Sequence, residues 1–67
     1  MKYEGVYKFT IPTYGSARGI VIEQENGELL EFWCDFDECS ERIRGISKGD
    51  SVVVNYIKDH EFIVTKA

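Results

Sequence analysis

The sequence has few of the features that identify secreted, membrane or disulfide-rich proteins. Its 67 residues include one proline, two cysteines (Cys34 and Cys39) and no apolar run near the roughly 18 residues of a membrane span. Two cysteines without a C-x-x-C motif are too few for a secreted disulfide framework, so we expect free thiols. The N-terminal residues lack the apolar segment of a signal peptide. We expect a cytoplasmic protein without a membrane partner.

Residues for a metal or catalytic site are also sparse. Zinc would have to be held by Cys34, Cys39 and His60 together with Asp37, and a Cys-x4-Cys spacing without a second pair is a weak signal. Nucleophilic catalysis needs a base beside a Ser or Cys, and the single histidine is far along the chain from both cysteines. So short a chain can hardly form a deep active-site cleft. We therefore expect no enzymatic activity, no metal and no cofactor.

Positive charge is absent from the middle of the chain. Residues 23–41 contain no Lys or Arg, whereas the flanks contain all eight basic residues of a chain whose net charge is −4. A solvated surface is the ordinary explanation for such an acidic segment. The functional alternative is a surface that repels polyphosphate or attracts a basic partner. The acidic segment contains Glu23, Glu25, Glu28, Glu31, Asp35, Asp37, Glu38 and Glu41.

Alternation of apolar and polar residues predicts β-strands along most of the chain. Residues 3–11 alternate with period two, and Pro12, which has no N–H for a neighbouring strand, is expected to end this strand. Asn26-Gly27 accepts the positive φ angles of a type I′ turn and predicts a hairpin. The remaining strands are predicted at 17–24, 29–36, 51–57 and 61–66.

A polar stretch, residues 37–50, separates the first three predicted strands from the last two. Within it, Asp37 or Ser40 could cap one short helical turn that carries Ile43 inward, and Gly45 could end it. Five short antiparallel strands suit a small closed barrel, because closure removes exposed sheet edges. The predicted fold is one all-β domain over residues 1–67, with the helical turn between the third and fourth strands.

The third predicted strand places the only tryptophan away from the core. Its residues alternate between two faces, and the face that contains Cys34 and Phe36 is the expected core. Cys34 then serves as a small buried hydrophobic residue. Trp33 is left among carboxylates on the outer face. The core face comprises Leu30, Phe32, Cys34 and Phe36, and the outer face comprises Leu29, Glu31, Trp33 and Asp35.

In the order and spacing of its strands, the chain resembles the cold-shock domain, a five-stranded member of the OB-fold barrels. The resemblance covers nearly all 67 residues. The family opens with G-x-V-K-W-F, which is similar to "GVYKFT"; Gly5 and Lys8 match, and Phe9 takes the place of the family's Trp. Farther on, "ISKGDSVVV" is similar to the L-x-x-G-x-x-V-x-F entry to the fourth strand of the family.

Both RNA-binding motifs of that family have a degraded counterpart here. The first, K-G-F/Y-G-F-I, is similar to "ARGIV" at residues 17–21, where Gly19 is kept and both aromatics are replaced. The second, V-F-V-H-F, is similar to "FWCDF". Trp33 and Phe36 match its two aromatics, and Asp35 takes the place of its histidine.

The resemblance implies a module that binds single-stranded RNA or DNA by stacking bases on outward aromatic side chains. Trp33 and Phe9 would stack bases, and Lys8 and Arg18 would contact phosphates. Asp35 would repel phosphates and so weaken binding. The implied nucleic-acid site comprises Lys8, Phe9, Tyr14, Arg18, Trp33 and Phe36.

Two other interpretations are compatible with the sequence. The aromatic patch or the acidic hairpin could dock onto another protein, which would make the chain a regulatory subunit or a phosphate-mimicking inhibitor. Alternatively, Trp33 is covered by the loop around Tyr14 or by a second copy of the chain. The charge around Trp33 distinguishes the two functional classes: a basic rim would support nucleic acid, and an acidic rim would support a protein partner.

Overall fold

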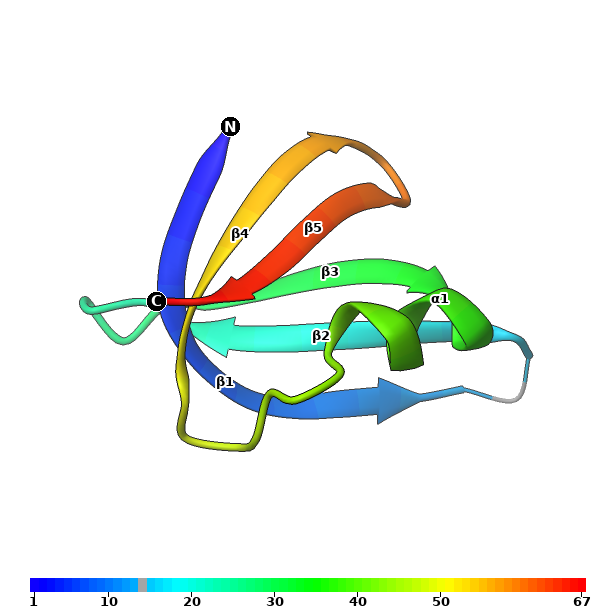
Figure 1. Ribbon diagram of the computed structural model, residues 1–67, viewed down its shortest axis with the longest axis horizontal. Coiled ribbons are helices and arrows are strands. Elements are labelled where there is room, and N and C mark those ends of the chain that lie inside the picture. Colours follow the sequence, from blue (N-terminus) through cyan, green and yellow to red (C-terminus); the bar gives the residue numbers. More distant parts are fainter. Residues whose placement is uncertain (14) are drawn as a thin grey trace.

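The computed structural model describes residues 1–13 and 15–67. Five antiparallel strands form one sheet with the order β3-β2-β1-β4-β5, and one short helix follows β3 (Figure 1). The all-β prediction, with a helical segment between the third and fourth strands, is confirmed. Tyr14 lies outside the described residues. The elements are β1 (Lys2–Pro12), β2 (Ala17–Glu23), β3 (Leu29–Asp35), α1 (Phe36–Arg42), β4 (Ser51–Lys58) and β5 (Glu61–Lys66).

The long strand β1 joins the two halves of the sheet. Residues 2–6 pair with β4, and residues 6–12 pair with β2. The register of the β1–β2 pair shifts between Tyr7 and Phe9, which leaves Lys8 in a bulge. Bulges bend a strand and increase its twist, and Figure 1 shows β1 curving strongly along its length.

The sheet differs from the predicted barrel in one respect, because it is not closed. Strands β3 and β5 are its two edges, and each pairs with a single neighbour. The arrangement is compatible with the partly open five-stranded barrel of the OB-fold type. Side chains of the two edge strands nevertheless meet in the core: the ring centres of Phe32 on β3 and Phe62 on β5 are 5.5 Å apart.

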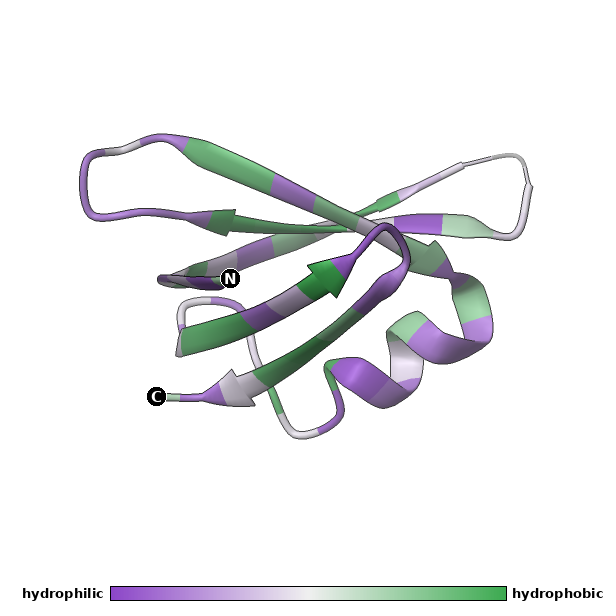
Figure 2. Cartoon of the chain, turned by 90° about the horizontal axis from the view of Figure 1, so that it is seen from above, coloured by the Kyte–Doolittle hydropathy of each residue, from purple (hydrophilic) through white to green (hydrophobic). Residues whose placement is uncertain are grey.

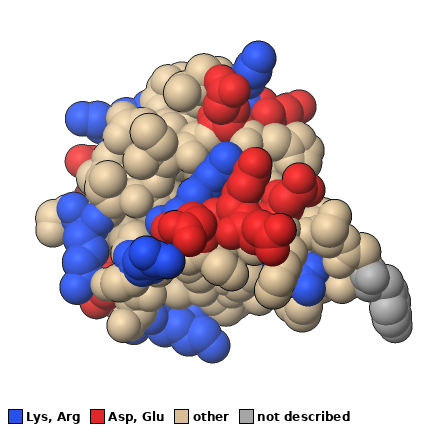
Figure 3. All heavy atoms as spheres, turned by 45° about the vertical axis from the view of Figure 1, so that its right-hand side comes forward, with Lys and Arg blue, Asp and Glu red and all other residues tan. Residues whose placement is uncertain are grey.

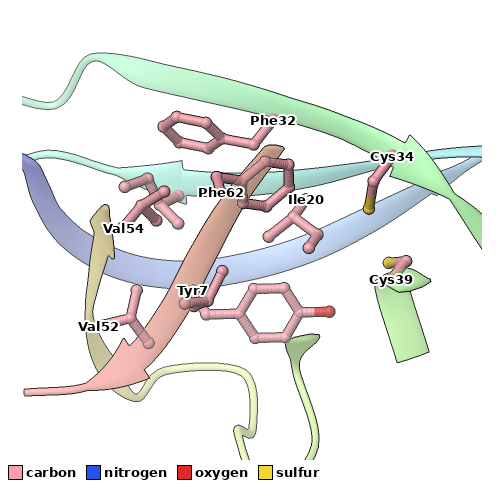
Figure 4. Close-up of a cluster of buried hydrophobic side chains, with 10 residues drawn as sticks. Tyr7, Ile20, Phe32, Cys34, Cys39, Val52, Val54 and Phe62 are labelled. Carbon is pink, nitrogen blue, oxygen red and sulfur yellow. The ribbon is translucent and has the colours of Figure 1, made fainter. Parts of the chain in front are cut away.

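The core lies between the two halves of the curved sheet and under α1 (Figure 4). Ile20 and Ile22 of β2 have no exposed surface, and burial of an aliphatic side chain of this size stabilises a fold by about 1.5–3 kcal/mol. Cys34 is also fully buried, as predicted. Along β3, buried Phe32 and Cys34 alternate with exposed Glu31 and Asp35, and Figure 2 shows the hydropathy of the residues along this ribbon. The core cluster contains Tyr7, Ile20, Ile22, Phe32, Cys34, Cys39, Val52, Val54, Phe62 and Val64.

The hairpin between β2 and β3 forms as predicted, but its turn is not of type I′. Gly27 N–H donates to Gln24 O, and Gln24 N–H donates to Glu28 O, both at 2.9 Å. Gly27 has a φ of 87°, whereas the only non-glycine with positive φ among the described residues is His60. The loop is therefore a type I turn followed by a left-handed glycine. Asn26 Oδ1 accepts from Glu28 N–H at 2.9 Å, and Asn26 does not have a positive φ.

The first strand ends one residue later than predicted. Pro12 is the last residue of β1 and lies opposite Arg18. The missing N–H costs little there, because this end of β1 has β2 as its single neighbour.

The third strand ends one residue earlier than predicted, and this changes the environment of Phe36. Asp35 is the N-cap of α1, so the cap is neither Asp37 nor Ser40. Because the helix begins at Phe36, the period-two alternation stops before it, and its side chain is 51% exposed instead of lying in the core. Ile43 packs against the core as expected, after the end of the helix. Gly45 follows with a φ of 78°.

In residues 1–13 and 15–67, no helix has the length and apolar character that a membrane crossing needs.

Candidate binding groove beside Trp33

The predicted nucleic-acid residues do not gather on one surface. Phe9 and Trp33 lie on the outer face of the sheet, where their strands are neighbours of β2. Arg18 pairs with Cys34, a core residue, and so lies on the opposite face from Trp33. Its guanidinium carbon lies 5.0 Å from the ring centre of Phe36. The structure thus separates the predicted site into two pairs, Phe9 with Trp33 and Arg18 with Phe36.

Lys8, the other predicted phosphate contact, already has an acidic neighbour. Its Nζ lies 3.2 Å from Glu23 Oε1, and both side chains are partly exposed. Such a surface ion pair contributes about 0–1 kcal/mol, so it can be broken at little cost. The carboxylate of Glu23 nevertheless stays beside Lys8 and opposes the approach of a phosphate. Tyr14, another residue of the predicted site, lies outside the described residues.

The outer face around Trp33 is tightly packed. Gly19 lies opposite Trp33 on β2, and a Cβ atom at position 19 would stand 2.9 Å from Cε2 and Cζ2 of the indole. One side of the indole therefore rests on the backbone of β2. Val21, the next outward residue of β2, is only 1% exposed. Trp33 is thus held against its own sheet, and its side chain is only partly exposed.

A groove opens between β3 and the β4–β5 turn. The larger of its two hollows has a volume of about 450 Å³ and is lined by Trp33, Tyr56 and the turn residues Asp59 and His60, among others. The smaller hollow, of about 270 Å³, shares Glu31, Phe32 and Tyr56 with it. We call the combined site the β3 groove. Its lining residues are Tyr3, Ala17, Leu30, Glu31, Phe32, Trp33, Tyr56, Asp59 and His60.

Aromatic rings form much of the wall of the β3 groove. The ring centres of Tyr3 and Phe32 are 5.6 Å apart, those of Phe32 and Tyr56 are 6.0 Å apart, and the rings are tilted. Tilted and edge-to-face pairs at these distances contribute about 0.5–1.5 kcal/mol each beyond simple burial. The Tyr56 hydroxyl donates to Asp59 Oδ1 at 2.6 Å, and this hydrogen bond raises the pKa of Tyr56 above its ordinary value. The wall is therefore ordered, and the tyrosine remains a neutral donor near pH 7.

The charged side chains that line the β3 groove are acidic. Glu31 Oε1 accepts a hydrogen bond from Trp33 Nε1 at 3.2 Å, and Asp59 lies at the opposite rim. Among the described lining residues there is no Lys or Arg. Arg42 contacts the β4–β5 turn, where its Nη2 donates to the His60 carbonyl at 2.9 Å. Figure 3 shows acidic side chains gathered in the middle of one face of the protein, with basic side chains beside them.

The free edge of β3 faces away from β2 along this groove. At the two ends of the hairpin, Gln24 N–H donates to Glu28 O and Phe36 N–H donates to Ser16 O. Hydrogen bonding alternates along an antiparallel pair, so the even-numbered residues of β3 bond to β2. Glu31 and Trp33 therefore direct their backbone N–H and C=O groups to the free edge.

The two thiols belong to the core and not to the groove. Cys34 of β3 and Cys39 of α1 are both free and buried, and their sulfur atoms point toward one another (Figure 4). Burial, together with the neighbouring Cys39, raises the pKa of the Cys34 thiol to about 11. His60 is exposed in the β4–β5 turn. In the part of the chain that the structure describes, no three His, Cys, Asp or Glu side chains form a group suited to a metal ion.

Trp33 is the one lining residue of the β3 groove that belongs to the predicted site, and Tyr3, Tyr56 and Asp59 are among those not anticipated from the sequence. Tyr3 and Tyr56 approach each other only because β1 pairs with β4, a contact between distant parts of the chain that strand periodicity does not reveal. Asp59 belongs to the short β4–β5 turn, where an exposed acidic residue is unremarkable in sequence.

Comparison of the chain with protein-family models, with curated proteins and with solved structures found no match.

Proposed function

We propose that this protein is an interaction module that binds a segment of another protein in the β3 groove. The observation that carries the proposal is the acidic rim around Trp33, made by Glu31 and Asp59 without a lining Lys or Arg in the described residues. Phosphate contacts dominate affinity for nucleic acids and need such cations. An ordered aromatic wall beside carboxylates is better suited to a polypeptide than to a polyanion.

The position of the two predicted phosphate contacts supports the same proposal. Arg18 lies across the sheet from Trp33, on the ring of Phe36. Lys8 is beside Glu23. A strand of nucleic acid stacked on Trp33 would meet two carboxylates and one partly neutralised lysine.

Single-stranded nucleic-acid binding is the second candidate. It is favoured by the placement of Phe9 and Trp33 on the outer face of neighbouring strands, as the resemblance to the cold-shock domain implies. Each base stacked on an aromatic side chain contributes about 1–3 kcal/mol and needs no particular base. This candidate requires stacking to outweigh the repulsion from Glu31 and Glu23.

Site-specific photo-crosslinking in cells that naturally make the protein tests the proposal. A photoreactive phenylalanine analogue replaces Leu29, which is 53% exposed at the start of β3, or, as the matched control, Ile63, which is 56% exposed on β5. We expect protease-sensitive adducts from position 29 and none from position 63. Nuclease-sensitive adducts at position 29 would favour nucleic acid. Absence of protein adducts there would overturn the proposal.

A further inference from the structure

We infer that the partner segment is a basic, extended peptide that adds a strand to the free edge of β3 and places a cationic side chain in the larger hollow of the groove. The inference rests on the proposed function and specifies the chemistry of the partner. The juxtaposition that carries it is a free strand edge next to aromatic rings and the two carboxylates of Glu31 and Asp59.

The backbone of β3 offers the pairing sites for an added strand. Glu31 and Trp33 direct their N–H and C=O groups to the edge, and the β2–β3 register is unbroken along seven residue pairs. Proteins usually protect an edge strand with charged side chains, especially Lys, with Pro or with a bulge. The charged residues of β3 are Glu31 and Asp35, which repel an acidic strand but not a basic one. Residues 29–35 contain no Lys or Pro, and the β2–β3 pairing has no register shift. Extended peptides bind other proteins by adding to edges of this kind.

The larger hollow suits a cation at the end of a long side chain. Cations are attracted to the faces of Trp and Tyr within about 6 Å of the ring centre, and a carboxylate beside the ring adds a charge-assisted hydrogen bond. The carboxylate of Glu31 accepts from Trp33 Nε1 and retains further acceptor sites. The Tyr56 hydroxyl donates to Asp59, which fixes the second carboxylate at the opposite rim.

The chain already uses cation–aromatic contacts elsewhere. The guanidinium carbon of Arg42 lies 4.3 Å from the ring centre of Phe62, and that of Arg18 lies 5.0 Å from the ring centre of Phe36. Within the described residues, neither Trp33 nor Tyr56 has such a cation from its own chain. Arginine fits the hollow better than lysine does, because a planar guanidinium can stack on a ring and bond a carboxylate at the same time.

The size of the hollow agrees with one side chain rather than a folded partner. Its volume of about 450 Å³ lies near the lower end of the range for small-molecule sites. The remaining contact would come from the backbone of the added strand. Binding should accordingly depend on both the cationic side chain and the peptide N–H groups.

Synthetic peptides separate these two contributions. The probe is a seven-residue peptide of alternating Thr and Val with one central arginine, capped at both ends, and binding is followed by the fluorescence of Trp33. Replacing the arginine with citrulline keeps its shape and removes the charge. We expect about tenfold weaker binding, which corresponds to the combined worth of an exposed cation–aromatic contact and an ion pair. N-methylation of the residues that face β3 should abolish binding.

Two charge variants locate the peptide on the protein. Glu31→Gln keeps an acceptor for Trp33 Nε1 and should weaken binding of the arginine peptide about threefold to fivefold, with no effect on the citrulline peptide. Glu25→Gln makes the same change in the β2–β3 turn, outside the groove, and should have no effect. Both variants should retain the melting temperature of the parent protein.

Each arm of the experiment has an outcome that contradicts the inference. Equal binding of the arginine and citrulline peptides would exclude a contribution of the positive charge to binding. Equal binding of the N-methylated peptide, or of free argininamide, excludes strand addition. Displacement of the peptide by a single-stranded oligonucleotide would show that the groove takes nucleic acid. If the photoreactive residue at position 29 crosslinks to protein but the arginine peptide does not bind, the inferred chemistry of the partner is wrong and the proposed function stands.

Discussion

The indole of Trp33 packs directly on the backbone of Gly19: a Cβ atom added at position 19 would stand 2.9 Å from Cε2 and Cζ2 of the ring. The only tryptophan of the protein thus depends on the absence of a side chain on the neighbouring strand. The two residues are opposite each other in the β2–β3 pair, so neither can move without disturbing the other.

Gly19→Ala should therefore displace the indole and destabilise the protein. We expect a shifted Trp emission maximum and a loss of about 1–3 kcal/mol in the free energy of unfolding, the usual cost of forcing extra volume into a packed site. Urea unfolding followed by circular dichroism measures the second effect. Gly15→Ala is the matched control, because a Cβ there meets no atom within 4 Å. Equal stability of the two variants would contradict the observed contact.

Gly27→Val should weaken the β2–β3 hairpin. Gly27 has a φ of 87°, a conformation that costs an ordinary L-residue about 1–2 kcal/mol and a β-branched one more. Gly27→Asn is the control, since asparagine tolerates the left-handed region better than valine does. Thermal melting should rank the parent protein above Gly27→Asn, and Gly27→Asn above Gly27→Val. An unchanged melting temperature for Gly27→Val would contradict the described turn.

The Cys34 thiol should react slowly with disulfide reagents in the folded protein. It is fully buried, and its pKa of about 11 keeps the reactive thiolate scarce near pH 7. We expect rapid labelling of both cysteines in urea and slow labelling of Cys34 without it. Mass spectrometry of the labelled peptides distinguishes Cys34 from Cys39. Labelling of Cys34 at the same rate in both conditions would show that it is not buried.

The same thiol predicts how stability depends on pH. Its pKa is raised from 9.0 to about 11 by folding, so the folded state holds the proton more tightly than the unfolded state does. The contribution of this group to stability is complete below pH 9 and is lost as the pH rises from 9 to 11. Urea unfolding across this range measures the loss. Cys34→Ala should flatten this part of the pH profile, and an equally steep profile in that variant would assign the loss to other groups.

Single-stranded oligonucleotides should leave the fluorescence of Trp33 unchanged. The test uses about six bases at about 20 mM salt, where screening is weak and attraction between phosphates and cations is strong. We expect no response, because the charges that line the β3 groove are those of Glu31 and Asp59. Quenching by single-stranded but not duplex DNA, with its loss in Phe9→Ala, would favour the nucleic-acid candidate instead.

Periodicity in the sequence was sufficient to predict most of the fold. The alternation at 51–57 and 61–66 predicts β4 and β5 nearly to the residue, and it places Cys34 in the core. It could not predict the exposure of Phe36, because the change from strand to helix at Asp35 depends on how α1 covers the sheet. Nor could it predict an open edge, which is a property of the pairing between distant strands.

The site was predicted less completely than the fold. The outward position of Trp33 follows from strand phase and is confirmed. Arg18 was matched to a family motif by residue spacing, although the hairpin register pairs it with Cys34 and so directs it to the other face. Tyr3 and Tyr56 were missed because their contact needs the β1–β4 pairing. The local sequence pattern therefore predicted the face on which Trp33 lies. The pairing of distant strands determined which side chains come into contact.

Strand β1 pairs with both β2 and β4, and this affects the order in which the strands can pair during synthesis. Residues 7–35 can form the three-stranded meander as soon as they leave the ribosome, since consecutive antiparallel strands need only short loop closures. Residues 2–6 must wait for residues 51–55 to emerge before they find their partner strand. Pairings between such distant segments form slowly and leave unpaired edges exposed in the meantime. The first half of β1 thus stays without a partner strand for longer during synthesis than the second half, which pairs with β2.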